Sequence, residues 1–327
     1  MMRRVRASLA AASAALALGV GAAMPEDWLQ RMDEAFRTAD YDGVFSYLDG
    51  ELSAFRIVHK VVDGVEHERL VYLDGARREI IRVGDDVSCI AEAGDELHAV
   101  IDQLPEGPYA RAFSPRLDGL GEHYDVRLKG QDRVAGRTAV RLAITPRDEN
   151  RYGYRVWLDQ DTALLLRSEL HDQAGRRLEV FQFTSLRTGD QVAAADASPS
   201  ATGLVTSRVP PASSGPLAPP AWRARWVPSG FRMTDGRGRV DTTSRQVSTL
   251  LFSDGIATFS VFVEAAPATA PAPATTRRGA TSLHTRLARG PERRSHLVTV
   301  VGEVPAATAR RIAEGIHYAP EEKNRGK

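Results

Sequence analysis

Turn dipeptides spaced along the first third of the chain limit its fold more than any other feature. They occur at Asp49-Gly50, Asp63-Gly64, Asp74-Gly75, Gly84-Asp85 and Gly94-Asp95, and the last four lie ten or eleven residues apart. The segments between them, such as FRIVHKVV and VEHERLVYL, are rich in strand-forming residues. Both residues of an Asp-Gly turn can take positive φ, which favours tight hairpins. The pattern predicts an antiparallel meander that begins near Tyr41.

A helix is predicted before the meander, and more strands are predicted after it. Within residues 26–41, apolar residues recur at helical spacing at Trp28, Leu29, Met32, Ala35 and Phe36, which predicts an amphipathic helix. Residues 105–124 are rich in proline and glycine and predict a loop. Strand-forming segments then resume. About ten strands with one early helix imply a large curved sheet that closes or covers its concave face.

Composition divides the chain into segments. The predicted organisation is a signal peptide at 1–23, a large domain at 24–190, a flexible linker at 191–220, a small α+β domain at 221–320 and a tail at 321–327. The linker prediction rests on Ala, Ser, Thr, Gly and Pro without hydrophobic periodicity. In the small domain we expect a hairpin turn at 253–255 and a short helix that opens with Pro305. Residues 266–286 are of low complexity and predict a mobile loop.

The N-terminal segment has the pattern of a cleaved signal peptide. Arg3, Arg4 and Arg6 precede a short run rich in alanine and leucine, and small residues at Ala22 and Ala23 suit cleavage. The alternative is a transmembrane anchor, but the apolar run is shorter than the ~20 residues that a span needs. A cleaved signal peptide implies that the mature protein is exported.

Charge and cysteine content exclude two further classes of protein. The chain has 43 basic and 42 acidic residues, and removal of the three signal-peptide arginines leaves a small negative net charge. The mature chain is therefore not a basic nucleic-acid-binding protein. Its only cysteine, Cys89, lies in the apolar stretch VSCIA, so no internal disulfide can form. A buried structural role for Cys89 is favoured over a reactive thiol.

No motif for catalysis or metal binding stands out in the sequence. The eight histidines do not form a metal-ligand spacing such as HExxH, and no G-x-S-x-G elbow occurs. The GRGRV stretch at Gly236 lacks the third glycine of a dinucleotide-binding loop. Asp159 and Asp161 could act as paired carboxylates, but their position at a strand turn favours turn chemistry. We therefore expect no enzyme activity, no cofactor and no metal, although catalytic groups can assemble from distant residues.

Several stretches resemble the MucB/RseB family of periplasmic regulators. They include RVAGR at 133–137, RYGYRVWLD at 151–159 and LDGARREIIR at 73–82 in the large domain, and WVPSGF, SDGIATFSVFVE and TVVGEVPAATARRIA in the small domain. The resemblance spans nearly the whole mature chain. It implies that the large domain is a half-open antiparallel barrel of the LolA/LolB lipoprotein-carrier type with covering helices, and that the small domain is a sheet with a helix.

The resemblance also implies a function and a location. Members of the family bind the periplasmic part of a membrane anti-sigma factor of the RseA/MucA type. They shield it from site-one proteolysis of the DegS/AlgW kind. Release by lipopolysaccharide or a related acyl-chain lipid then frees an envelope-stress sigma factor of the sigma-E/AlgU type. The chain is thus expected in the periplasm and without a nucleic-acid partner. A homo-oligomer is left open, because self-association is common in the family.

A lipid-binding hollow is expected on the large sheet. Alternation puts Tyr152, Tyr154, Val156 and Leu158 on one face of their strand, and Leu164, Leu166 and Leu170 on one face of the next. Each buried CH₂ of an acyl chain would contribute about 0.8 kcal/mol. The alternative is that these residues simply fill the core. The candidate cavity residues are Tyr72, Ile80, Tyr152, Tyr154, Val156, Leu158 and Leu166.

The small domain carries candidate residues for contact with the anti-sigma factor, namely Trp226, Phe231, Phe259 and Phe262. Phe262 alternates with Val261 and lies on the opposite face from Phe259 and Val261 in an extended strand, so it is the best placed to face a partner. We expect this domain and the interdomain cleft to supply much of the contact. Two other functions stay open: a lipid or lipoprotein carrier without a regulatory partner, and an envelope hydrolase.

Overall fold

The computed structural model describes residues 24–84, 86–91, 119–199, 205–209, 221–240, 246–267, 269 and 272–319. The predicted signal peptide, the tail at 321–327, the turn at Gly94-Asp95 and most of the loop at 105–124 lie outside these residues. In the described part of the chain, no helix is long and apolar enough to cross a membrane.

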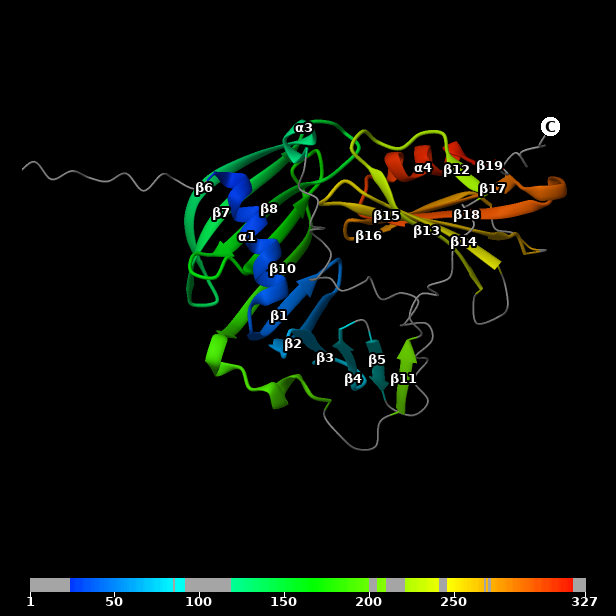
Figure 1. Cartoon of the computed structure of the whole chain (residues 1–327). Helices are drawn as coiled ribbons and strands as arrows, with labels where there is room; N and C mark the ends of the chain where they lie inside the picture. The colour runs from blue at the N-terminus through cyan, green and yellow to red at the C-terminus, as the bar shows by residue number, and fades with distance from the viewer. Residues whose placement is uncertain are drawn as a thin grey trace, which may run out of the picture.

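The large domain is built on one curved antiparallel sheet of eleven strands, in the order β11-β5-β4-β3-β2-β1-β10-β9-β8-β7-β6 (Figure 1). The strands are β1 (Tyr41–Leu48), β2 (Leu52–Val62), β3 (Val65–Tyr72), β4 (Arg78–Val83), β5 (Asp86–Ala91), β6 (Tyr124–Val134), β7 (Arg137–Pro146), β8 (Gly153–Asp159), β9 (Leu165–His171), β10 (Arg177–Thr188) and β11 (Val205–Val209). The predicted meander is confirmed as β1 to β5. At its second turn, Asp63 and Gly64 both have positive φ, as a tight hairpin requires.

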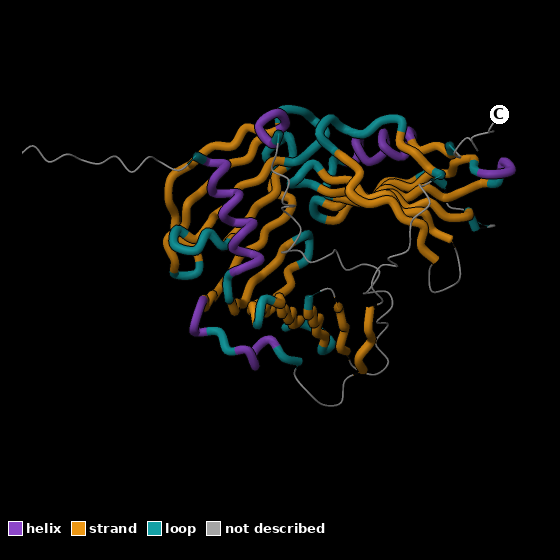
Figure 2. The backbone as a smooth tube through the Cα atoms, viewed as in Figure 1, coloured by secondary structure: helices purple, strands orange, loops and turns teal. Residues whose placement is uncertain are grey.

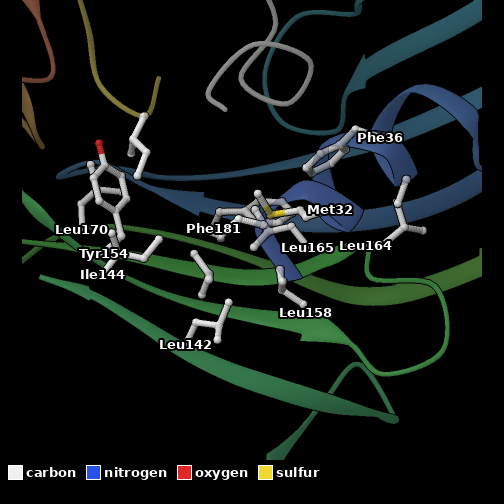
Figure 3. Close-up of a cluster of buried hydrophobic side chains, with 14 of the residues drawn as sticks. Met32, Phe36, Leu142, Ile144, Tyr154, Leu158, Leu164, Leu165, Leu170 and Phe181 are labelled. Atoms are coloured by element: carbon white, nitrogen blue, oxygen red, sulfur yellow. The ribbon is translucent and has the colours of Figure 1, made fainter. Parts of the chain in front are cut away.

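Helix α1 (Pro25–Thr38) covers the concave face of this sheet (Figures 1 and 2). Pro25 occupies its first turn, and the Asp27 side chain accepts a hydrogen bond from the Met24 amide. Two residues of the helix, Leu29 and Met32, are fully buried against the sheet. Figure 3 shows Met32 among leucine side chains of the sheet and Phe181. The predicted apolar stripe is therefore a packing face. A single turn, α3 (Leu120–His123), precedes β6.

The segment predicted as a plain linker contributes to the large domain. It contains the short 3₁₀ helix η2 (Ala194–Ala197), and η1 (Gly189–Gln191) overlaps its start. Val192 and Ala197 pack against Val58 on the convex side of the sheet, and β11 pairs with β5 at the sheet edge. The sequence did not predict this packing, because each contact is made by an isolated small side chain and the segment has no hydrophobic periodicity.

The small domain is a six-stranded antiparallel sheet, in the order β13-β14-β15-β18-β17-β16, with helix α4 on one face (Figure 1). Its elements are β12 (Trp222–Ala224), β13 (Arg232–Val240), β14 (Gln246–Ser253), β15 (Thr258–Ala265), β16 (Ala274–Arg278), β17 (Thr281–Arg289), η3 (Pro291–Arg293), β18 (Ser295–Gly302), α4 (Ala306–Gly315) and β19 (Ile316–Tyr318). The predicted hairpin and closing helix are confirmed. The expectation of a loop throughout 266–286 is wrong, since β16 and the first part of β17 lie there.

Each domain has its own apolar core. One lies between α1 and the large sheet, and the other lies between α4 and the small sheet. Two small-domain residues, Ile256 and Ala280, belong to the core of the large domain instead. Both sit in turns at the same end of the small sheet, between β14 and β15 and between β16 and β17. The small domain therefore docks by its turns.

Candidate functional site

A buried ion pair joins the two domains. Arg151, which precedes β8, is 0% exposed and donates to the Asp254 carboxylate across 2.7 Å. It also donates to the carbonyl of Ser229, and its guanidinium lies 5.3 Å from the ring centres of both Tyr124 and Phe231. Tyr124 donates its hydroxyl proton to the same carboxylate across 2.9 Å. Arg151 is thus enclosed by groups from both domains.

The β14–β15 turn positions Asp254 for this contact. The carboxylate also accepts hydrogen bonds from the amides of Ile256 and Ala257, at 3.0 and 2.8 Å. Gly255 has a φ of 97°, in the region that favours glycine. The turn therefore directs Asp254 to Arg151 while Ile256 enters the large core.

A second junction lies at the β16–β17 turn. The carboxylate of Glu179, on β10, accepts hydrogen bonds from the Ala280 amide and from the Tyr47 hydroxyl, both at 2.7 Å. Gly279 has a φ of 55°, and a Cβ atom there would lie 2.6 Å from a Glu179 carboxylate oxygen. Only glycine fits this close approach. Beside it, Tyr154 donates to the carboxyl of Glu303, which follows β18, across 3.3 Å.

Four of the predicted cavity residues lie in the packed core of the large domain. Tyr154, Val156 and Leu158 share the inner face of β8, as alternation predicts, and Tyr152 lies just before the strand. All four belong to the cluster beneath α1. Their exposed fractions are 5%, 0%, 0% and 3%, in that order. Figure 3 shows Tyr154 and Leu158 among these packed side chains. These four side chains contact other side chains of the protein, as expected if they fill the core and do not line a lipid-binding hollow.

Leu166 lies on the other side of the sheet. The β8–β9 register shifts between Trp157 and Leu158, so that Trp157 pairs with Arg167 while Leu158 pairs with Leu165. Leu166 has no partner in this bulge and packs instead beside Trp157. The expectation that Leu164, Leu166 and Leu170 share one face is wrong, because Leu164 and Leu170 belong to the inner core without Leu166.

The remaining cavity candidates are more accessible. Tyr72 and Ile80 are half-buried, and they lie with half-buried Phe55 on the inner side of β2 to β4. Phe55 pairs with Tyr72 across the strands, and their ring centres are 4.9 Å apart. We call Phe55, Tyr72 and Ile80 the meander face. It is the predicted lipid-binding region in which apolar side chains keep contact with solvent.

The four small-domain candidates occupy different environments. Phe231 and Phe259 are 5% and 1% exposed and pack in the core beneath α4. Trp226 is half-buried, with the Arg311 guanidinium 3.8 Å from its ring centre. Phe262 is half-buried and points to the opposite side of the sheet from Phe259. The structure therefore does not bring the four together on one surface.

Phe262 has apolar neighbours that sequence reasoning missed. The strand pairings place several half-buried residues on the same side of the small sheet, away from α4: Val247, Leu251, Leu283, Leu297 and Val301. None of them belongs to the core beneath α4. We call this set, with Phe262, the open face. Strict alternation in each strand was the signal that could have identified it.

The acidic pair that was considered for catalysis is explained by turn structure. Asp159 is 1% exposed and accepts hydrogen bonds from the Thr162 amide and hydroxyl. Arg137 donates to both of its carboxylate oxygens, and these contacts hold the pKa of Asp159 below its usual value in spite of burial. Among the described residues, no group of three or more His, Cys, Asp or Glu side chains is arranged to hold a metal ion.

Comparisons with known proteins follow the same division into two domains. The MucB/RseB N-terminal domain matches residues 24–201, and the MucB/RseB C-terminal domain matches residues 216–317. The chain is 40% identical over 305 residues to the sigma factor AlgU regulatory protein MucB of Pseudomonas aeruginosa, covering 90% of this chain and 91% of that protein. It is 30% identical over 305 residues to the sigma-E factor regulatory protein RseB of Escherichia coli K12, covering 89% of each.

Solved structures show the same similarity. The complex of Pseudomonas aeruginosa MucA and MucB matches with a TM-score of 0.73 at 37% identity, covering 90% of this chain and 99% of the matched chain. A crystal structure of MucB matches with a TM-score of 0.65 at 36% identity, covering 90% and 98%. Both domain models and full-length relatives agree, so the chain belongs to the MucB/RseB family.

Proposed function

We propose that this protein is a periplasmic regulator that binds the periplasmic segment of a membrane anti-sigma factor of the MucA/RseA type. Bound there, it shields the segment from site-one proteolysis. The observation that carries the proposal is the match, over almost the whole solved chain, to a MucB bound to MucA. The relatives are named as regulatory proteins, which supports a binding role over catalysis. Export by a cleaved signal peptide is part of the proposal.

A protease-protection assay tests this function directly. The purified mature protein is mixed with the periplasmic segment of its anti-sigma factor, and cleavage by the site-one protease is followed over time. Slower cleavage that depends on the concentration of the regulator is expected. A cleavage rate that the regulator leaves unchanged would refute shielding, while binding measured in parallel would show whether the complex forms.

The open face is the proposed docking surface for this segment. Its half-buried side chains surround Phe262, and an aromatic anchor among apolar neighbours is typical of residues that dominate binding energy. The Phe262→Ala variant is expected to weaken binding by roughly tenfold or more. Calorimetry or fluorescence anisotropy with the labelled segment measures the change.

The matched control for this variant is Leu128→Ala. Leu128 is 47% exposed but lies on β6, in the large domain. Its replacement is expected to leave the affinity unchanged. Equal affinities for Phe262→Ala and the wild type would remove the open face from the proposal without affecting the family assignment.

We also propose that an acyl-chain lipid or lipopolysaccharide releases the segment by binding at the meander face. The two ligands are then linked: the lipid lowers the affinity for the segment, and the segment lowers the affinity for the lipid by the same factor. Tyr72→Ser is expected to reduce the release caused by lipopolysaccharide in a titration of the complex. If lipid and segment bind together with independent affinities, the release mechanism is wrong.

A lipid carrier is the alternative function, and the meander face is the observation that favours it. A carrier predicts tight binding of acylated cargo and no protection of the anti-sigma segment. The protection assay therefore separates the two functions.

A further inference from the structure

Two carboxyl groups from different domains meet at the second junction. Glu179 comes from β10 in the large domain, and Glu303 follows β18 in the small domain. Each raises the pKa of a common neighbour, Tyr154, and the charge on Glu179 raises the pKa of Glu303. In the described part of the chain, neither carboxylate forms an ion pair with a lysine, arginine or histidine. Glu179 is buried and Glu303 is half-buried, so two like charges without a cation are unfavourable at this junction.

The two carboxyl groups differ in the hydrogen bonds that they accept. Glu179 accepts from the Tyr47 hydroxyl and the Ala280 amide, and the Thr281 amide also lowers its pKa. These donors favour the charged form of Glu179. Within the described residues, Glu303 accepts a single hydrogen bond, a long one from Tyr154. When the two groups hold a single proton between them, it therefore resides on Glu303.

The pKa values follow the same division. The pKa of Glu303 is raised to about 7, chiefly by burial and also by the neighbouring Glu179 carboxylate, while the Tyr154 hydrogen bond acts in the opposite direction. Burial also raises the pKa of Glu179, against the effect of its hydrogen-bond donors. Carboxyl groups in water titrate near pH 4, so docking of the domains changes the proton affinity of Glu303.

Within the ranges that the structure describes, the cations near this junction are paired with other carboxylates. Asp49, in the β1–β2 turn, adds to the negative potential at Glu179. The guanidinium of Arg278 approaches the junction but is held by Asp49 and by Glu51. On the other side, Asp254 is already paired with Arg151. The hydroxyls of Tyr47 and Tyr154 also face the pair, and they stay protonated at neutral pH because burial raises their pKa.

We propose that the junction is a proton-binding site and that Glu303 must hold a proton for the small domain to dock tightly on the large domain. The direction follows from linkage. A carboxyl group whose proton affinity is higher in the docked state favours docking most at acidic pH. That contribution is lost as the pH rises through about 7, the pKa of docked Glu303. The proposal does not depend on which partner the protein regulates.

Hydrogen exchange of the Ala280 amide measures docking without a label. Ala280 is 0% exposed and its amide donates across the junction to Glu179, so it exchanges only when the contact opens. With the rate corrected for intrinsic pH dependence, its protection factor is expected to fall roughly tenfold to thirtyfold between pH 5.5 and 8. The Val300 amide, in the core beneath α4, is the internal reference and is expected to keep its protection.

Two variants make the test specific. Glu303→Gln is uncharged at every pH, so Ala280 is expected to stay protected from pH 5.5 to 8. Glu179→Gln removes the neighbouring charge, so the midpoint of the transition is expected to move to lower pH. Glu314→Gln replaces an exposed glutamate of the same domain and is expected to behave as the wild type. A pH-independent wild type, or a Glu303→Gln protein that titrates as the wild type does, overturns the proposal.

Discussion

Replacement of Arg151 by alanine is expected to lower the free energy of unfolding by about 3–5 kcal/mol. Both the arginine side chain and the Asp254 side chain are 0% exposed, so the variant leaves a buried carboxylate without its cation. The carbonyl of Ser229 also loses its donor. Urea denaturation followed by tryptophan fluorescence and circular dichroism measures the loss. Because the pair joins the two domains, separate transitions for each domain are expected in the variant.

The control for Arg151→Ala is Arg176→Ala. Arg176 is 74% exposed and pairs with Asp172 in the turn between β9 and β10. Exposed pairs of this kind contribute about 0–1 kcal/mol, so this variant is expected to unfold almost as the wild type does. An Arg151→Ala protein within 1 kcal/mol of the wild type, roughly the contribution of a surface pair, would contradict the buried role assigned to Arg151.

Phe259→Ala is expected to cost about 3–5 kcal/mol of stability. Phe259 is 1% exposed and stacks on Phe252, with ring centres 4.9 Å apart. Its removal leaves a cavity between the small sheet and α4 that the surrounding strands cannot close. Thermal and chemical denaturation measure the effect. The variant is also expected to bind the anti-sigma segment poorly, but only because its small domain is unstable.

Phe262→Ala provides the comparison on the same strand. Phe262 is three residues away, half-buried and on the opposite side of the sheet, so its loss is expected to cost roughly 1 kcal/mol or less. Stability and binding should therefore separate: Phe259 supports the fold, and Phe262 contacts the partner. A Phe259→Ala protein with wild-type stability would show that the core beneath α4 tolerates the cavity and would end this distinction.

The sequence predicted the elements whose signals are local. The amphipathic stripe of α1, the Asp-Gly turns of the meander and the alternation along β8 each depend on residues a few positions apart. The bulge at Leu166 was missed because it depends on the pairing of β8 with β9, which no single strand reveals. Strand β16 was missed because its five residues are small or polar and all exposed, so the strand has no apolar alternation to detect.

The candidate site was harder to predict, because its parts come from distant segments. Arg151 and Asp254 are 103 positions apart, and Glu179 and Ala280 are 101 apart. Each looks like an ordinary turn or strand residue in its own segment. Arg151 was already part of the RYGYRVWLD match to the family, but only the docked domains show what it binds. The aromatic candidates of the small domain could not be divided between core and surface until the position of α4 was known.

The pairing of β11 with β5 fixes where the small domain is tethered. From Val209, the last residue of β11, to Ala221 the chain spans at most roughly 40 Å. A small domain that leaves its junctions therefore remains within this radius of the sheet edge, at an effective concentration of the order of millimolar. Redocking is then intramolecular and independent of protein concentration, so opening of the junctions is reversible even when the protein is scarce.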